Sequence, residues 1–252
     1  MMDHMGNEII IKVRHLYKSF KTENVLSDIN LELFHGENLV ILGKSGAGKS
    51  VLLKCITGLI PPDRGEIILF DHNIKDLDED ALDKLKKKIG YVFQGAALYD
   101  SMSVRENLLF HLDRAENDLS QKETEQLIEG ILKNVGLEDS IDKMPSELSG
   151  GMRKRAGLAR ALVLRPEIIM YDEPTTGLDP ATSHEISELI LQIQQIFSTS
   201  SIIVTHDMHC ARLTSNRIMI LENSCFIAEG TYKSLRDDKT RSVKDYFLNQ
   251  IS

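Results

Sequence analysis

The octapeptide Gly43–Ser50, with the sequence GKSGAGKS, constrains the fold more than any other stretch of this chain. It matches the phosphate-loop pattern G-x-x-x-x-G-K-[S/T] at every fixed position. An apolar run at Asn38–Leu42 precedes it, and Val51–Thr57 after it has the apolar spacing of a helix. Glycines let backbone N–H groups curl around a phosphate, and a helix N-terminus adds partial positive charge. The pattern predicts a strand–loop–helix anion site, and an ordinary glycine-rich turn is the alternative.

The two residues after the last glycine have separate tasks in such a site. The Lys49 ammonium is expected to reach the β- and γ-phosphates of a nucleotide. The Ser50 hydroxyl is expected to ligate Mg²⁺.

Composition narrows the class of protein. At 252 residues the chain can bury a sizeable core, as one large domain or as a domain with an insertion. Its net charge of −8 argues against a nucleic-acid-binding surface, so no nucleic-acid partner is expected. The count and spacing of the three cysteines fit neither a zinc site nor a disulfide framework, and Cys55 and Cys210 are expected to be buried free thiols. Neither a signal peptide nor a membrane span is expected.

Strand-like and helix-like patterns alternate along most of the chain. Strands are expected over residues 9–14, 25–34, 38–42, 66–70, 89–93, 168–171, 201–205 and 217–222, and helices over 51–57, 78–88, 123–135, 152–164 and 181–197. From residue 95 to about residue 164 the pattern is mostly helical. This order favours an α/β core that carries an inserted helical subdomain.

Two adjacent acids, Asp172 and Glu173, follow the apolar run Ile168–Tyr171. If that strand lies beside the strand of the phosphate loop, Asp172 comes close to Mg²⁺, directly or through water. Glu173 would then be the general base that polarises the attacking water. The alternative is a plain strand-end turn before Pro174.

A second glycine-containing turn lies at Leu148–Met152, with the sequence LSGGM. Gly150 and Gly151 leave N–H groups free at the start of the next helix, beside the Ser149 hydroxyl, which makes a second anion site. A helix cap with no further role is the alternative. The turn begins 24 residues before Asp172 (172 − 148) and follows the phosphate loop in the chain.

The order of phosphate loop, Leu-Ser-Gly-Gly and strand-Asp-Glu resembles the ATP-binding-cassette (ABC) ATPases over nearly the whole chain. This resemblance implies an α/β fold: a phosphate-loop NTPase core of the RecA-like type, an N-terminal antiparallel β subdomain and an inserted α-helical subdomain. The implied division is one ABC ATPase domain over 1–252, with the nucleotide-binding core at 1–94 and 166–252 and the helical signature subdomain at 95–165. The implied activity is hydrolysis of ATP with Mg²⁺, coupled to transmembrane transport.

The resemblance also implies roles for individual residues. The implied catalytic residues are Glu173, His206 and Gln94, where Gln94 matches the family's lid glutamine and His206 its switch histidine. The implied magnesium ligands are Ser50, Gln94 and Asp172, and Asp179 is implied to touch the opposite subunit. ATP is expected to contact Phe20, Gly43, Ser45, Gly46, Ala47, Gly48, Lys49, Ser50 and Val51 of one chain and Ser149, Gly150 and Gly151 of its partner. Taken alone, His206 could be structural and Phe20 could belong to the core.

The implied assembly is a homodimer that closes head to tail on ATP and binds integral-membrane permease subunits at the cytoplasmic face of the inner membrane, as a peripheral protein. The residues agree with it, because one ATP needs donors on both sides and the chain carries two separate helix-N-terminal phosphate binders.

The run LSGGMRKRAGLARA at residues 148–161 is similar to the ATPases of the lipid-transport systems of the Mla and Mce type. Most cassettes carry Gln where this chain has Met152, and Thr where it has Val51. Phospholipid or another envelope lipid is therefore the implied cargo, and a lipid-binding envelope protein is an implied partner. The alternative is the ATPase of a polar-solute importer for amino acids or similar compounds.

Two other classes are open from the sequence. A cassette that acts on DNA or ribosomes is disfavoured by the acidic charge and by the absence of a long coiled-coil insertion or a second cassette. A module that binds nucleotide without hydrolysing it is disfavoured by Lys49, Glu173 and His206.

An apolar cluster at residues 96–102, including Leu98 and Tyr99, follows Gln94 in a stretch that otherwise reads as loop. Such a cluster is expected to be covered. Either a permease subunit covers it, or it packs under the chain's own helical subdomain.

Overall fold

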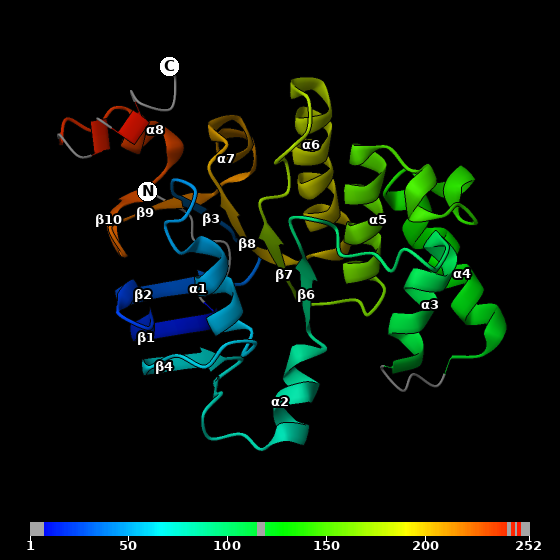
Figure 1. The fold of residues 1–252 in the computed structure, drawn as a ribbon, viewed down its shortest axis with the longest axis horizontal. Coiled ribbons are helices and arrows are strands. Elements are labelled where there is room, and N and C mark those ends of the chain that lie inside the picture. The colour runs from blue at the N-terminus through cyan, green and yellow to red at the C-terminus, as the bar shows by residue number, and fades with distance from the viewer. Residues whose placement is uncertain (1–7, 115–118, 241–242, 245, 248–252) are drawn as a thin grey trace.

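A computed structural model describes residues 8–114, 119–240, 243–244 and 246–247 of the chain. Its strands form two sheets, and helices pack against them (Figure 1). The mixed sheet comprises β3 (Asn38–Leu42), β6 (Ile89–Val92), β7 (Ile168–Asp172), β8 (Ser200–Thr205), β9 (Arg217–Glu222) and β10 (Cys225–Gly230), in the order β10-β9-β3-β8-β7-β6.

All neighbours in the mixed sheet are parallel except β10, which pairs antiparallel with β9. Strands β3, β7 and β8 are buried at every position, as expected for parallel strands covered on both faces. Because β8 lies between β3 and β7, the carboxyl ends of these three strands meet at one edge of the sheet.

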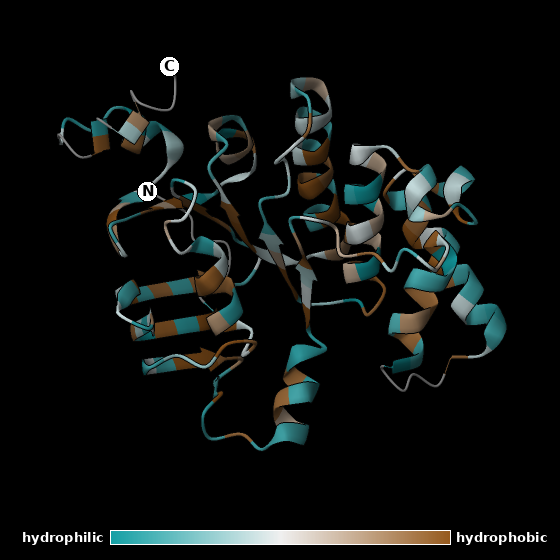
Figure 2. Ribbon diagram, viewed as in Figure 1, coloured by the Kyte–Doolittle hydropathy of each residue, from teal (hydrophilic) through white to brown (hydrophobic). Residues whose placement is uncertain are grey.

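The second sheet is antiparallel and contains β1 (Ile9–Phe20), β2 (Glu23–Phe34), β4 (Arg64–Leu69) and β5 (His72–Asn73), in the order β2-β1-β4-β5. Its strands alternate hydrophobic and hydrophilic residues (Figure 2). The apolar side packs with α1 (Lys49–Ile56) and β3 in one hydrophobic cluster that includes Leu16, Ile41 and Leu53. The predicted antiparallel β subdomain is thereby confirmed.

Strand β1 is longer than the predicted strand over residues 9–14. The pairing of β1 with β2 shifts register between Val13 and Leu16, and His15 there has φ +47°. Such a bulge interrupts the two-residue alternation, so the sequence pattern stops while the strand continues.

The helical block lies between β6 and β7 in the chain, although these two strands pair directly in the sheet. It comprises α3 (Val104–Arg114), α4 (Gln121–Asn134) and α5 (Gly150–Leu162), with 3-10 turns η1 (Glu138–Ser140) and η2 (Pro145–Glu147) between α4 and α5. The three helices lie together beside the β6 edge of the mixed sheet, away from the antiparallel sheet (Figure 1). The predicted α/β class with a helical insertion is confirmed.

The remaining helices are α2 (Glu79–Lys86), which precedes β6, and α6 (Pro180–Phe197), α7 (Met208–Thr214) and α8 (Tyr232–Arg236). Helices α4 and α5 each begin two residues before the predicted start, because a polar residue caps each of them. Ser120 and Glu123 form a capping box at α4, and Ser149 accepts a hydrogen bond from the Met152 N–H at α5. In the part of the chain that the structure describes, no helix is both long enough and apolar enough to cross a bilayer.

Two expectations about apolar residues have clear outcomes. Cys55 and Cys210 are buried free thiols, as predicted. In the cluster at residues 96–102, Ala96 is buried and Leu98 packs against the chain's own core, which confirms the second alternative for these two residues. Tyr99 is 40% exposed, and its ring meets Phe110 of α3 edge-on.

Candidate nucleotide site

The phosphate loop connects β3 to α1, as the sequence predicts. Gly48 caps α1 with φ +98°, and a Cβ atom there would lie 2.8 Å from the Val25 carbonyl oxygen. Gly46 also has a left-handed conformation, with φ +82°. Both positions therefore require glycine, and the resulting turn brings loop N–H groups to the start of α1, where an anion is stabilised.

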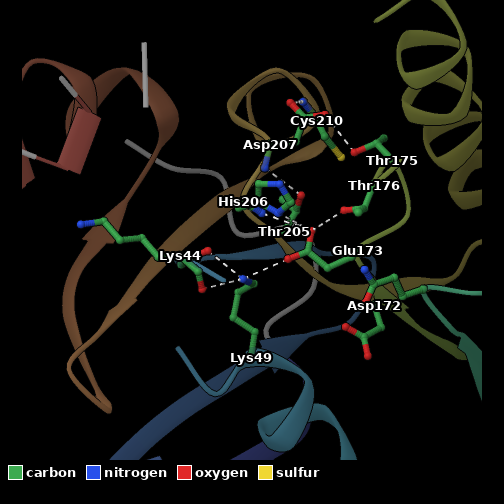
Figure 3. A network of polar contacts seen from close by, with 12 residues as sticks. Lys44, Lys49, Asp172, Glu173, Thr175, Thr176, Thr205, His206, Asp207 and Cys210 are labelled. Atoms are coloured by element: carbon green, nitrogen blue, oxygen red, sulfur yellow. Dashed lines mark hydrogen bonds and ion pairs between the residues drawn. The ribbon is translucent and has the colours of Figure 1, made fainter. Parts of the chain in front are cut away.

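Lys49 lies at the centre of a polar network (Figure 3). Its side chain is 5% exposed, and its ammonium donates to the carbonyl oxygens of Gly43 at 2.7 Å and Lys44 at 3.1 Å. The same nitrogen forms an ion pair with Glu173 Oε1 at 3.0 Å. The cation of the phosphate loop thus contacts the acid that follows β7.

Glu173 receives donors from three places besides Lys49. Its Oε2 atom accepts from the Thr176 hydroxyl at 3.0 Å and lies 2.8 Å from His206 Nδ1 and 3.4 Å from the His206 backbone nitrogen (Figure 3). Glu173 has φ +51°, a conformation that costs a non-glycine residue about 1 kcal/mol. The turn after β7 therefore aims this carboxylate at the phosphate loop and at the end of β8.

Asp172, the last residue of β7, is held by two hydroxyl groups. Its Oδ1 atom accepts from Ser50 Oγ at 2.6 Å, and its Oδ2 atom accepts from the Tyr91 hydroxyl at 3.1 Å. Two causes raise the pKa of Tyr91 well above its ordinary value: burial, which is the larger, and the nearby negative charge of Asp172. Hydroxyl and carboxylate oxygens are ligands that Mg²⁺ prefers, so Ser50 and Asp172 fit this ion.

A cleft of about 420 Å³ opens over these groups. The predicted residues that line it are Ser45, Gly46, Gly48, Lys49, Ser50, Val51, Gln94, Glu173 and His206, and Val25 and Thr176 line it as well. Thr176 was not predicted, although its place three residues after Glu173 in a turn could have indicated it. Ala47 lines an adjoining cleft between the phosphate loop and Asn223.

Ser149, Gly150, Gly151, Asp179 and Phe20 do not line this cleft. Ser149 and Asp179 cap α5 and α6, and both are exposed. A Cβ atom on Gly151 would come within 2.6 Å of Thr182, so the two helix starts pack together. Hydrogen bonds from Thr182 hold the pKa of Asp179 below its ordinary value. Phe20 is 45% exposed, so the alternative that it belongs to the core is wrong.

Residues 26–176, which contain the phosphate loop, the Leu-Ser-Gly-Gly turn and the two acids, match the family model described as "ABC transporter". This chain belongs to the ABC transporter ATPase family. It is an ATPase that uses ATP with Mg²⁺. The cleft lined by Lys49, Ser50 and Glu173, with Asp172 hydrogen-bonded to Ser50, is its candidate nucleotide site.

Known proteins are similar to this chain over most of its length. The methionine import ATP-binding protein MetN of Campylobacter jejuni is 37% identical, over 94% of this chain and 75% of the relative. Protein TRIGALACTOSYLDIACYLGLYCEROL 3, chloroplastic, of Arabidopsis thaliana is 35% identical, over 89% of this chain and 69% of the relative. A dimeric post-hydrolysis structure of the ATP-binding cassette MJ0796 with ADP and Pi has a TM-score of 0.80 and 32% identity, over 88% of this chain and 98% of that one.

Proposed function

We propose that this cassette ATPase hydrolyses ATP with Glu173 as general base, and that closure of a head-to-tail homodimer drives separate permease subunits. The carrying observation is the position of the Glu173 carboxylate, 3.0 Å from Lys49 and 2.8 Å from His206 in the cleft over the phosphate loop. We also propose that the domain divides into a nucleotide-binding core at residues 1–94 and 166–252 and a signature subdomain at residues 95–165.

The contacts suggest how the residues work in sequence. Lys49 is paired with Glu173 here, and ATP phosphates offer the ammonium a stronger anionic partner. Once Lys49 turns to the phosphates, Glu173 is free to accept a proton from water as the water oxygen bonds to the γ-phosphorus and the β,γ-bridging P–O bond breaks. His206 then orients Glu173 and contacts the γ-phosphate. Ser50, Asp172 and Gln94 would hold Mg²⁺, which neutralises charge on the phosphates.

Replacing Glu173 with Gln tests this role. We expect ATP binding to be retained and turnover to fall by about 10²-fold or more, the scale of losing a general base. The variant should also accumulate as an ATP-bound dimer. Lys49→Ala serves as the contrast, because it should weaken nucleotide binding itself by removing a contact to ground-state phosphates. Turnover of Glu173→Gln within about twofold of the unmodified protein would refute the assignment.

For the cargo we propose phospholipid or another envelope lipid, delivered with a lipid-binding envelope protein. The signature run at residues 148–161 supports this proposal, as does the lipid in the name of the Arabidopsis relative. The name of MetN favours the alternative, an importer of an amino acid or similar polar solute. Cells lacking this protein should have altered envelope lipids and increased detergent sensitivity. Unchanged lipids with defective uptake of an amino acid or sugar would favour the alternative.

We further propose that the protein sits at the cytoplasmic face of the inner membrane and that the permease docks near Tyr99. This ring is 40% exposed, whereas its neighbour Ala96 is buried. Tyr99→Asp should leave the protein folded and able to bind ATP, yet abolish co-purification with the permease. Normal co-purification of the folded variant would place the docking surface elsewhere.

A further inference from the structure

Lys154, in the second turn of α5, is a nearly buried cation bound to two backbone carbonyl groups. The Lys154 residue is only 8% exposed to solvent. The ammonium donates to the carbonyl oxygen of Gln94 at 2.5 Å and to that of Glu173 at 3.1 Å. Burial lowers the pKa of Lys154, and the charges of Glu173 and Asp172 act in the opposite direction. A buried ammonium is expensive unless its donors are used, so this placement calls for an explanation.

One face of α5 lies along the segment 94–97 and contacts it at three positions. Lys154 holds the carbonyl group of Gln94, and Arg160 donates to the carbonyl group of Ala97. Between them, Gly157 leaves room for the loop, because a Cβ atom there would lie 3.1 Å from the Cα and O atoms of Ala96. The spacing of three residues places all three on one side of the helix. The loop that carries Gln94 therefore rests on α5.

Lys154 differs from Arg160 because it also reaches the turn that carries Glu173. The Glu173 backbone N–H donates to the Val204 carbonyl at 3.0 Å, which ties one side of this residue to β8. Its carbonyl oxygen accepts from Thr176 N at 3.3 Å and from Lys154 at 3.1 Å. With φ at +51°, the Glu173 backbone is in a conformation that only its surroundings maintain.

We propose that Lys154 is a positioning residue for ATP hydrolysis, which joins the Gln94 loop, the Glu173 turn and the signature helix α5 into one unit. This inference rests on the proposed role of Glu173 as general base. Because α5 begins at the Ser149–Gly151 turn, the residue that fixes the base in one chain lies on the helix that is proposed to meet the ATP of the other chain. A shift of α5 is transmitted through one ammonium to both Gln94 and Glu173.

The test compares Lys154→Met, Lys154→Gln and Arg155→Met in steady-state ATP hydrolysis by the full chain. Methionine keeps most of the stem and removes every donor, whereas the glutamine amide keeps two N–H donors without charge. Arg155 is the matched control on the same helix: it donates to the Val135 carbonyl and pairs with Glu185, away from the site.

We expect Lys154→Met to lower kcat about 10- to 100-fold, the effect of misplacing a reacting group by on the order of 1 Å, with KM for ATP within about threefold. Lys154→Gln should recover at least about threefold of this loss, and Arg155→Met should stay within about twofold of the unmodified kcat. Circular dichroism and the melting temperature identify any variant that fails to fold. A folded Lys154→Met with unchanged kcat, or a folded Lys154→Gln as impaired as Lys154→Met, would overturn the proposal.

A second comparison separates this proposal from the role of Glu173. If Lys154 acts through Glu173, Lys154→Met should cost less than about threefold in a Glu173→Gln background, because the effects of residues that act as a unit are not additive. An equal loss in both backgrounds would show that Lys154 does not act through Glu173. Full turnover of Glu173→Gln alone would instead refute the general-base assignment, whatever Lys154→Met does.

Discussion

Replacing Tyr91 with Phe should remove one hydrogen bond that orients the Asp172 carboxylate, and it should thereby weaken the binding of Mg²⁺. The substitution removes the hydroxyl that donates to Asp172 Oδ2 at 3.1 Å and keeps the ring that packs 4.2 Å from Phe93. A hydrogen bond to a charged group contributes about 1.5–3 kcal/mol. Because this one is longer than the roughly 2.5–2.7 Å usual for a hydroxyl on a carboxylate, we expect a loss near the lower limit, about 1.5 kcal/mol.

Two measurements follow from that magnitude. For a domain of about this size, a loss of about 1.5 kcal/mol lowers the melting temperature by roughly 3–6 °C. If the whole loss falls on the Mg²⁺ site, the Mg²⁺ concentration for half-maximal turnover rises by up to about tenfold. Both can be measured, by thermal unfolding monitored by circular dichroism and by a Mg²⁺ titration of ATP hydrolysis.

Tyr171→Phe is the matched control for Tyr91→Phe. Tyr171 lies next to Asp172 in β7, and its buried hydroxyl has no hydrogen-bond partner in the described part of the chain. Removing it should leave both quantities unchanged or raise the melting temperature. If Tyr91→Phe changed neither the melting temperature nor the Mg²⁺ requirement, the Tyr91 hydroxyl would not be holding Asp172 in the working enzyme.

Two further predictions concern thiol reactivity and stability. Burial raises the pKa of Cys55 to about 11 and that of Cys210 to about 12, so both thiols stay protonated at about pH 8. Iodoacetamide should therefore label the partly exposed Cys225 first. All three cysteines should be labelled after unfolding. Rapid labelling of Cys55 or Cys210 in folded protein would contradict this. Arg217 donates to both carboxylate oxygens of Glu37, and both side chains are mostly buried, so Arg217→Met should lower the free energy of unfolding in urea by about 3 kcal/mol. A loss below about 1 kcal/mol would show that water readily replaces this pair.

Much of the site could be predicted because it depends on local patterns. The glycines and Lys49 of the phosphate loop fix the turn before α1, and the apolar run before Asp172 identifies a buried strand. Once both strands are placed in one parallel sheet, their carboxyl ends must lie near each other, so the meeting of Ser50 with Asp172 follows.

The parts that the sequence did not indicate depend on which strands are neighbours. The bond from Tyr91 to Asp172 requires β6 to pair with β7, and the bonds of Lys154 require α5 to lie against the turn after β7. No periodicity along the chain encodes either. Short elements such as β5, β10, α7 and α8 were also missed, because they contain too few residues to show a repeat. Phe20 is the last residue of β1 and is 45% exposed, whereas Leu16, earlier in the same strand, is buried.

We propose that ATP is hydrolysed between two chains, with Lys49 of one chain facing Ser149 of its partner. Ser149→Arg and Lys49→Ala should each abolish ATP-driven dimer closure when pure. A mixture of the two variants contains heterodimers in which one site has both an unmodified Lys49 and the partner's unmodified Ser149. We therefore expect the mixture, followed by light scattering with Mg²⁺ and ATP, to regain dimers that neither pure variant forms. Equal loss of dimers in the mixture and in both pure variants would contradict the composite site.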